Sequence, residues 1–185
     1  MANGEKYQHK VTFLEGWKVS QVLAELWSRD SIKREIYDDD PKVIANLLGL
    51  DTDNAEGMVF PDTYFFTRNT SDITLLKRAN QKLTSVLTKA WVSRAEELPL
   101  NNAYEALILA SVIEKESGLN SERSKISGVF LRRMELGMRL QSDPTVIYGM
   151  GSKYRGNISR EDLLESTPYN TYRIDGLPPT PISLA

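Results

Sequence analysis

The stretch LILASVIEKESGLN, residues 107–120, has apolar or small residues on every side up to two acids, Glu114 and Glu116, and then a glycine. A helix that is apolar all round is typically buried in the middle of a core. The last turn of this helix then reaches the rim of the core. Because an α-helix has about 3.6 residues per turn, Glu114 and Glu116 are rotated about 200° apart, and only one of them can face a given cleft.

Glu114 continues the stripe through Leu107 and Ala110 and is the acid at the rim of the core. Partial desolvation and the negative end of the helix dipole both disfavour a charged carboxylate at this place. These two effects favour a general acid, so Glu114 is a candidate catalytic residue. The alternative is a structural ion pair of Glu114 with a buried arginine such as Arg133 or Arg139.

The composition is that of an ordinary soluble globular protein and excludes several functions. The 185 residues carry 23 basic and 25 acidic side chains, and the net charge of −2 gives no case for nucleic-acid binding. No run approaches the roughly 20 apolar residues that span a bilayer, so we expect the chain as given to be soluble. The absence of cysteine excludes disulfides and thiolate metal sites, and we expect neither a metal nor a cofactor.

The first half of the chain predicts short strands and amphipathic helices, which places the fold in the α+β class. An alternating run puts Val11 and Phe13 on one face of a strand, and residues 19–27 then follow helical spacing. The segment DPKVIANLLG, residues 40–49, begins with an N-cap aspartate and a proline and ends at a glycine, as short helices commonly do.

Longer helices are expected from about residue 71 onward, in what should be a helix-rich main domain. The pattern from Ser71 to about Leu98 predicts a helix that forms a wall of the main core. Its expected core positions are Leu76, Ala79, Leu83, Val86, Leu87, Ala90 and Trp91. Asn102 with Glu105, and Ser159 with Asp162, have the spacing of capping boxes at two further helix starts.

Polar and aromatic groups interrupt the apolar elements that follow Glu114. Tyrosine offers a flat apolar face to a sugar ring, and amides bond to hydroxyl and acetamido groups. This mixture is typical of a sugar-binding groove. The candidate substrate-binding residues are Gln141, Asp143, Thr145, Tyr148, Tyr169, Asn170 and Tyr172.

Four strings are long and specific: EGMVFPDTY, ASVIEKES, VFLRRMELGMRLQSDPTVIYGMG and TPYNTYRIDGLPPTPI. Together they resemble the YceG-like family of endolytic murein transglycosylases over roughly residues 10–182. The catalytic glutamate of that family is the first acid of its EKE motif, which falls on Glu114, in agreement with the helix argument. The family's LQSDPTVIY and YNTY motifs fall on the candidate substrate-binding residues. Arg132 stands where the family often has asparagine, so we assign Arg132 no role.

The resemblance implies a partial LysM-like subdomain, a module associated with glycan binding, over residues 1–55 and a transglycosylase domain over residues 56–185. Relatives have an N-terminal membrane anchor and continue past the last residue, so we expect an excised portion with a truncated C-terminal segment, and a cloning remnant in the first four residues, MANG. The implied location of the full-length protein is the cell envelope, at the periplasmic face of the inner membrane.

The implied substrate is the glycan strand of peptidoglycan, and cell-wall synthases are further expected partners. A lytic transglycosylase uses no water, so one acid suffices. Glu114 would protonate the oxygen of the MurNAc–GlcNAc β-1,4 linkage and then remove the proton of the C6 hydroxyl, leaving 1,6-anhydroMurNAc ends and terminating or trimming nascent strands. Glu116 and Arg133 would support the site, with Glu116 held by an arginine such as Arg123 or Arg133 or by amides around Gly118.

Two alternatives remain at this stage. A hydrolytic muramidase would use Glu114 together with Asp143 or Glu116, because ordinary glycosidases need two carboxylates. Asp143, directly before Pro144, is also explained as the N-cap of a short helix. A non-catalytic glycan-binding module would instead recruit other cell-wall enzymes through LysM-like and tyrosine-rich surfaces.

Overall fold

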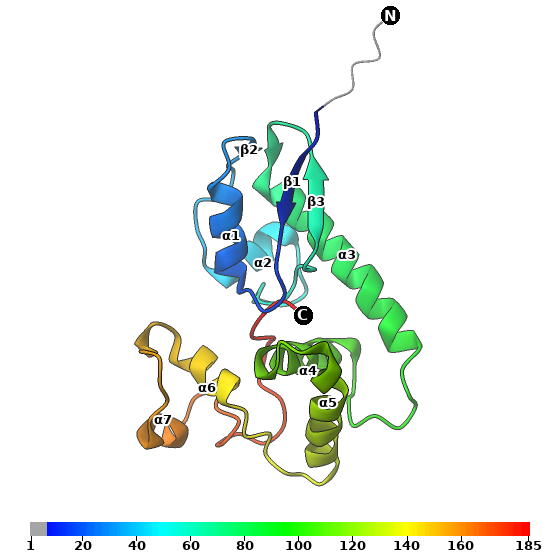
Figure 1. The fold of residues 1–185 in the computed structure, drawn as a ribbon, viewed down its shortest axis with the longest axis vertical. Helices are drawn as coiled ribbons and strands as arrows, with labels where there is room; N and C mark the ends of the chain where they lie inside the picture. The colour runs from blue at the N-terminus through cyan, green and yellow to red at the C-terminus, as the bar shows by residue number, and fades with distance from the viewer. Residues whose placement is uncertain (1–6) are drawn as a thin grey trace, which may run out of the picture. The chain divides into compact units, whose positions relative to one another are not determined.

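The computed structural model describes residues 7–185, which form two compact units. The first unit runs to Ser85 and also contains Leu184, and the second consists of residues 86–183 with Ala185. Figure 1 shows the paired strands in the first unit and helices α4 to α7 in the second. Helices predominate over two small sheets, which confirms the α+β class. The proposed cloning remnant lies outside the described residues.

The first unit packs two small sheets and helices around one core. β1 (His9–Thr12) pairs antiparallel with β3 (Thr63–Phe66), and β2 (Ile32–Lys33) pairs parallel with β4 (Thr70–Ser71). The helices are α1 (Val19–Trp27), α2 (Pro41–Leu48) and the first part of α3 (Asp72–Val92). The core includes Val11, Phe13, Val22, Leu23, Leu26, Ile44, Tyr64, Leu75, Leu76 and Leu184.

The predicted ends of α2 are confirmed. The carboxylate of Asp40 accepts a hydrogen bond from the amide of Lys42, and Pro41 occupies the first helical position. Gly49 has a φ of 69°, in the left-handed region that glycine enters without steric cost. Local sequence chemistry therefore set both ends of this helix.

α3 differs from its prediction in length and in burial. It ends at Val92 rather than near Leu98, and its last buried residue is Leu83. Val86 is 39% exposed and Val92 is 77% exposed, so the second half is not the core wall that we expected. The physical reason is that the first unit ends at Ser85 and the helix continues beyond it.

The boundary expected after residue 55 does not coincide with the division between the units. β3 pairs with β1 along its whole length, and β4 pairs with β2. Leu75, Leu76 and Ala79 of α3 also join the first core. Long-range strand pairing therefore keeps residues 56–85 with the N-terminal part of the chain.

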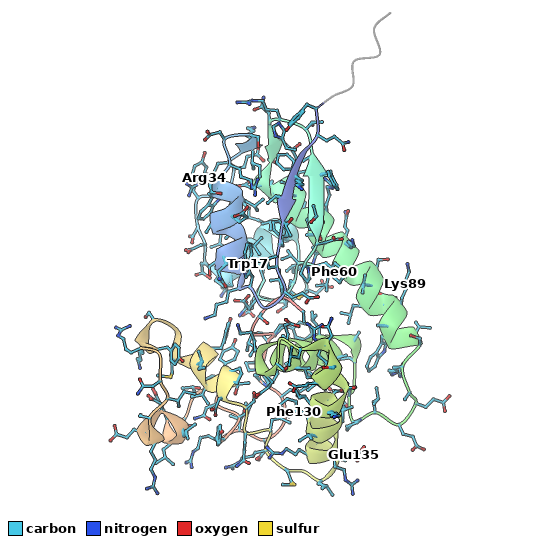
Figure 2. The ribbon with its side chains drawn as sticks, viewed as in Figure 1. Trp17, Arg34, Phe60, Lys89, Phe130 and Glu135 are labelled. Atoms are coloured by element: carbon cyan, nitrogen blue, oxygen red, sulfur yellow. The ribbon has the colours of Figure 1, made fainter. Side chains whose placement is uncertain are left out.

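The second unit contains the helices that carry the candidate site. They are α4 (Ala103–Glu116), α5 (Asn120–Glu135), α6 (Asp143–Met150), the 3₁₀ helix η1 (Gly151–Lys153) and α7 (Arg160–Leu164). Its core contains Leu109, Val112, Phe130, Leu140 and Ile182. Figure 2 labels Phe130 on α5, where the helix faces this core. Within residues 7–185, no helix combines the length and the apolar character needed to cross a bilayer.

Candidate active site

α4 is the largely buried helix that its apolar run predicts. Leu107, Leu109 and Val112 are buried, and Ser111 is fully enclosed. The Ser111 hydroxyl donates to the carbonyl of Ile108 at 2.7 Å and accepts the amide of Ile182 at 3.0 Å. The C-terminal segment of the chain therefore packs along α4 and helps to bury it.

The start of α4 is also close to its prediction. The Asn102 side chain accepts a hydrogen bond from the amide of Glu105 at 2.9 Å, which confirms the N-cap. The Glu105 carboxylate accepts from the amide of Asn101 rather than that of Asn102, so the capping box is displaced by one residue. At α7, Ser159 and Asp162 form the predicted capping box.

Glu114 lies in the last turn of α4, and its side chain is only 10% exposed. One of its carboxylate oxygens lies 2.5 Å from Nη2 of Arg123, in the first part of α5. The ion pair that we considered as an alternative exists, but its partner is neither Arg133 nor Arg139. Both members line a pocket of about 330 Å³ whose other walls are Ala110, Ile113, Ser124, Ser127 and Ala185.

Glu116 points to a different neighbour from Glu114, as the helical rotation predicts. Glu116 as a residue is exposed, but its carboxylate accepts a partly buried hydrogen bond of 2.5 Å from the hydroxyl of Ser142. The expected arginine partner is a wrong prediction, because Arg123 pairs with Glu114. Arg133 instead donates to the carbonyl of Leu140 at 2.5 Å. Arg133 therefore supports the segment before α6 rather than Glu116.

Three of the candidate substrate-binding residues form a polar cluster at the start of α6. Gln141 is exposed and has a φ of 53°, which is uncommon for a residue with a side chain. The backbone amide of Gln141 donates to the backbone carbonyl of Thr171 at 3.1 Å. The Tyr172 hydroxyl donates to a carboxylate oxygen of Asp143 at 2.6 Å. Asp143 is the first residue of α6, so its predicted N-cap role is wrong, and Ser142 occupies that position.

Of the other four candidates, Thr145 and Asn170 are buried in structural positions, whereas Tyr148 and Tyr169 are half-buried. Thr145 is fully buried, and its hydroxyl bonds to the carbonyl of Ser142 at 2.7 Å. Asn170 is 1% exposed, and its amide group donates to the last carbonyls of the α7 region. Tyr148 and Tyr169 pack with ring centroids 4.7 Å apart against the second core. Burial of Thr145 and Asn170 removes these two residues from the expected groove, and the other candidates remain predictions.

The structure adds residues that sequence reasoning did not connect with Glu114. Arg123 was considered only as a partner of Glu116, and Ser142 and Thr171 were not singled out. Ser142 is 1% exposed and its amide donates to the Thr171 hydroxyl at 2.9 Å. Nothing in the local pattern marks these contacts, since the partners lie 26 and 29 residues apart.

Charge in the polar cluster has a measurable consequence for Tyr172. Its hydrogen bond to Asp143 is the main cause that raises the pKa of Tyr172 to about 12, and desolvation and the negative charge of Glu116 add to the effect. In the part of the chain that the structure describes, no three His, Asp or Glu residues are grouped so that they could hold a metal ion.

We predict that Tyr172 ionises late in the folded protein. Tyrosinate absorbance would be followed during a pH titration of the wild-type protein and of Tyr172→Phe. The transition that is present in wild type and absent from Tyr172→Phe should lie near pH 12, above the ordinary tyrosine pKa of about 10. Because the pKa is raised on folding, the stabilising contribution is present below about pH 10 and is lost as the pH rises toward 12. Asp143→Asn should move the transition back toward 10, and a wild-type transition already at 10 would contradict the Asp143 contact.

We also predict that Glu116 and Ser142 stabilise the fold as a pair. Glu116→Gln and Ser142→Ala should each lower the free energy of unfolding by about 1 kcal/mol, because one partly buried hydrogen bond is weakened or lost. The double variant should lose little more than either single variant, which denaturant unfolding can measure. Additive losses would show that the two side chains do not interact.

The sequence of this chain is similar to that of known proteins along nearly its whole length. The sequence model of the YceG-like family matches residues 1–185. The endolytic murein transglycosylase of Bacillus subtilis (strain 168) is 30% identical over an alignment that covers 97% of this chain and 54% of that protein. The endolytic murein transglycosylase of Streptococcus pneumoniae serotype 2 (strain D39) is 34% identical over 133 residues, which cover 69% of this chain and 23% of that protein.

The fold is also similar to that of a solved structure. The crystal structure of a yceG-like protein from Listeria monocytogenes matches with a TM-score of 0.71 and 26% identity, over 95% of this chain and 63% of that one. Fold and site together define the class of helix-rich α+β proteins in which a buried helix presents one acid to a small pocket. The chain belongs to the YceG-like family. It spans about half the length of the Bacillus subtilis relative.

Proposed function

We propose that this chain is the glycan-cleaving portion of an endolytic murein transglycosylase, with Glu114 as its single acid and base. The observation that carries the proposal is the pocket around Glu114. Among the lining residues that the structure describes, Glu114 is the sole acidic side chain, and Glu116 is directed to Ser142 instead. One acid in one pocket suits a reaction that uses no water. The names of the relatives support the same reaction class.

In the proposed mechanism, Glu114 acts twice. It first donates a proton to the oxygen of the MurNAc–GlcNAc β-1,4 linkage, and the bond from that oxygen to the anomeric carbon breaks. The C6 hydroxyl of the same muramic acid then attacks the anomeric carbon and returns its proton to Glu114. The product is a 1,6-anhydroMurNAc end, and cleavage within a nascent strand terminates or trims it. A low exposed fraction, 10% for Glu114, keeps competing water away from the acid.

The polar cluster at the start of α6 gives the second candidate function, a hydrolytic muramidase. Glu116 and Asp143 both act on the charge state of Tyr172, so the two carboxylates lie in one neighbourhood. A pair of carboxylates is what hydrolysis of a glycosidic bond requires. In that case Glu116 and Asp143 do the chemistry and Glu114 has only a structural ion pair.

Mass spectrometry of the products from purified glycan strands separates the candidates. Transglycosylation leaves anhydro ends, hydrolysis leaves ends heavier by one water, and a binding module leaves the strands intact. The proposal expects anhydro ends from the wild-type protein and from Glu116→Gln. Complete loss of cleavage in a Glu116→Gln protein as stable as wild type would instead favour the two-carboxylate mechanism.

The proposal also covers the substrate, the cellular location and the partners of the protein. The substrate is the peptidoglycan glycan strand, the place of action is the cell envelope at the periplasmic face of the inner membrane, and cell-wall synthases are the expected partners. Residues 1–55 are proposed to form a partial LysM-like glycan-binding module. Cosedimentation of the Glu114→Gln protein with insoluble peptidoglycan tests binding without cleavage.

A further inference from the structure

The ion pair of Glu114 has a geometry that suggests a role in addition to stability. Nη2 of Arg123 lies 2.5 Å from Oε2 of Glu114, and the side chains are 31% and 10% exposed. Charge-assisted hydrogen bonds of this kind are the stronger ones in proteins. Because both groups line the same pocket, Arg123 fixes a group that a bound glycan would meet.

The corner that precedes Arg123 in the chain is held by contacts that do not involve Glu114. The corner between α4 and α5 is closed by the Ser117 hydroxyl, which donates to the Glu122 carboxylate at 2.6 Å. The same hydroxyl accepts the amide of Leu119 at 3.1 Å. Arg123 directly follows Glu122 in α5, so the corner fixes the backbone from which the Arg123 side chain reaches Glu114.

We propose that Arg123 is a positioning residue for Glu114, and this inference rests on the proposed function. A single acid must donate a proton at the start of the reaction and accept one at the end from the same place. The guanidinium holds the carboxyl group in one orientation for both steps. It also stabilises the carboxylate that exists between them, and it gives up no proton of its own.

Arginine suits this role better than lysine. The guanidinium keeps its protons under all conditions in which the protein is folded, so it cannot compete with Glu114 as a proton donor. Its planar group restricts the direction of the bond, whereas a lysine ammonium is a mobile point charge. A substitution by lysine therefore preserves the charge and loses the orientation.

The experiment compares the kinetics of glycan cleavage for wild type, Arg123→Ala, Arg123→Lys and a matched control, Arg132→Ala. Arg132 is on the same helix but pairs with Glu135, near the far end of α5, where Figure 2 labels Glu135. A misplaced catalytic group costs about 10²-fold, so kcat should fall about 10- to 100-fold in Arg123→Ala with KM nearly unchanged. The kcat of Arg123→Lys should lie between that of Arg123→Ala and that of wild type.

Two readouts separate positioning from a purely structural role. Added guanidinium ions should restore part of the kcat of Arg123→Ala and should not affect Arg132→Ala. The carbon-13 resonance of the Glu114 carboxyl, identified by its absence from Glu114→Gln, should move in Arg123→Lys but not in Arg132→Ala. If Arg123→Ala does not fold, Arg123→Lys and its resonance provide the decision.

The outcomes are distinct for the two proposals. Wild-type kcat in the Arg123 variants, or a fall in kcat equal to that of Arg132→Ala, would overturn the positioning role and leave the transglycosylase proposal standing. A wild-type protein that cleaves no glycan would overturn the proposed function itself. An unmoved Glu114 resonance in Arg123→Lys would also overturn the positioning role, whatever the activity.

Discussion

Replacement of Glu114 by glutamine is expected to reduce the turnover of glycan cleavage by about 10²- to 10⁴-fold, the usual contribution of general acid catalysis. The amide keeps the shape of the side chain and can still accept a hydrogen bond from Arg123. It cannot donate a proton to a leaving oxygen or take one from the C6 hydroxyl. Turnover measured by mass spectrometry of released ends checks the expectation.

The control for Glu114→Gln is Glu135→Gln, which removes an acid from an exposed pair on α5. The control should keep wild-type turnover, and thermal unfolding should show that both variants are folded. If Glu114→Gln retained most of its turnover, the acid would lie elsewhere. Glu116, with Asp143 near it, would then be the first residue to test.

The largest expected effect on stability concerns Asp72, the first residue of α3. Asp72 is fully buried, and its carboxylate accepts the amides of Glu35 and Ile36 at 3.1 Å. It also accepts the indole N–H of Trp27 at 3.3 Å. The amide of Ile73 donates to the same carboxylate at 2.8 Å, so Asp72→Ala removes the acceptor for four donors. Each donor left unsatisfied away from water costs about 1 to 3 kcal/mol.

We therefore expect Asp72→Ala to lower the free energy of unfolding of the first unit by about 3 to 5 kcal/mol, a large part of the 5 to 15 kcal/mol that stabilises an ordinary domain. Denaturant unfolding followed by tryptophan fluorescence measures the change, since Trp27 contacts Asp72. Asp39→Ala, at an exposed acid, is the matched control and should change little. Equal, small effects of the two substitutions would show that the buried network contributes little.

Much of the fold was predictable because local patterns determine local structure. The apolar period of residues 19–27 became α1, and the sequence around Asp40 and Gly49 set both ends of α2. The unbroken apolar run before Glu114 became the buried helix α4. In each of these cases the residues that decide the structure lie within a few positions of one another.

The site was predictable only in part. The position of Glu114 at the end of α4, and its rotation away from Glu116, follow from helix geometry and are seen in the structure. The buried positions of Thr145 and Asn170 were not predictable, because both have polar side chains that suit a surface groove as well as a protein interior. Their burial depends on contacts with α6, α7 and the 171 region that no local pattern specifies.

The sequence by itself thus determined which helix is buried and which acid ends it, since periodicity and capping act over a few residues. Only the tertiary structure decided what each acid meets. The amide of Ile182 reaches Ser111 across 71 positions, and Ser142 reaches Glu116 across 26. Arg123 pairs with Glu114 because a short corner turns α5 back toward the end of α4. Such partners are chosen by the packing of the whole unit, which satisfies buried polar groups wherever the chain brings a donor and an acceptor together.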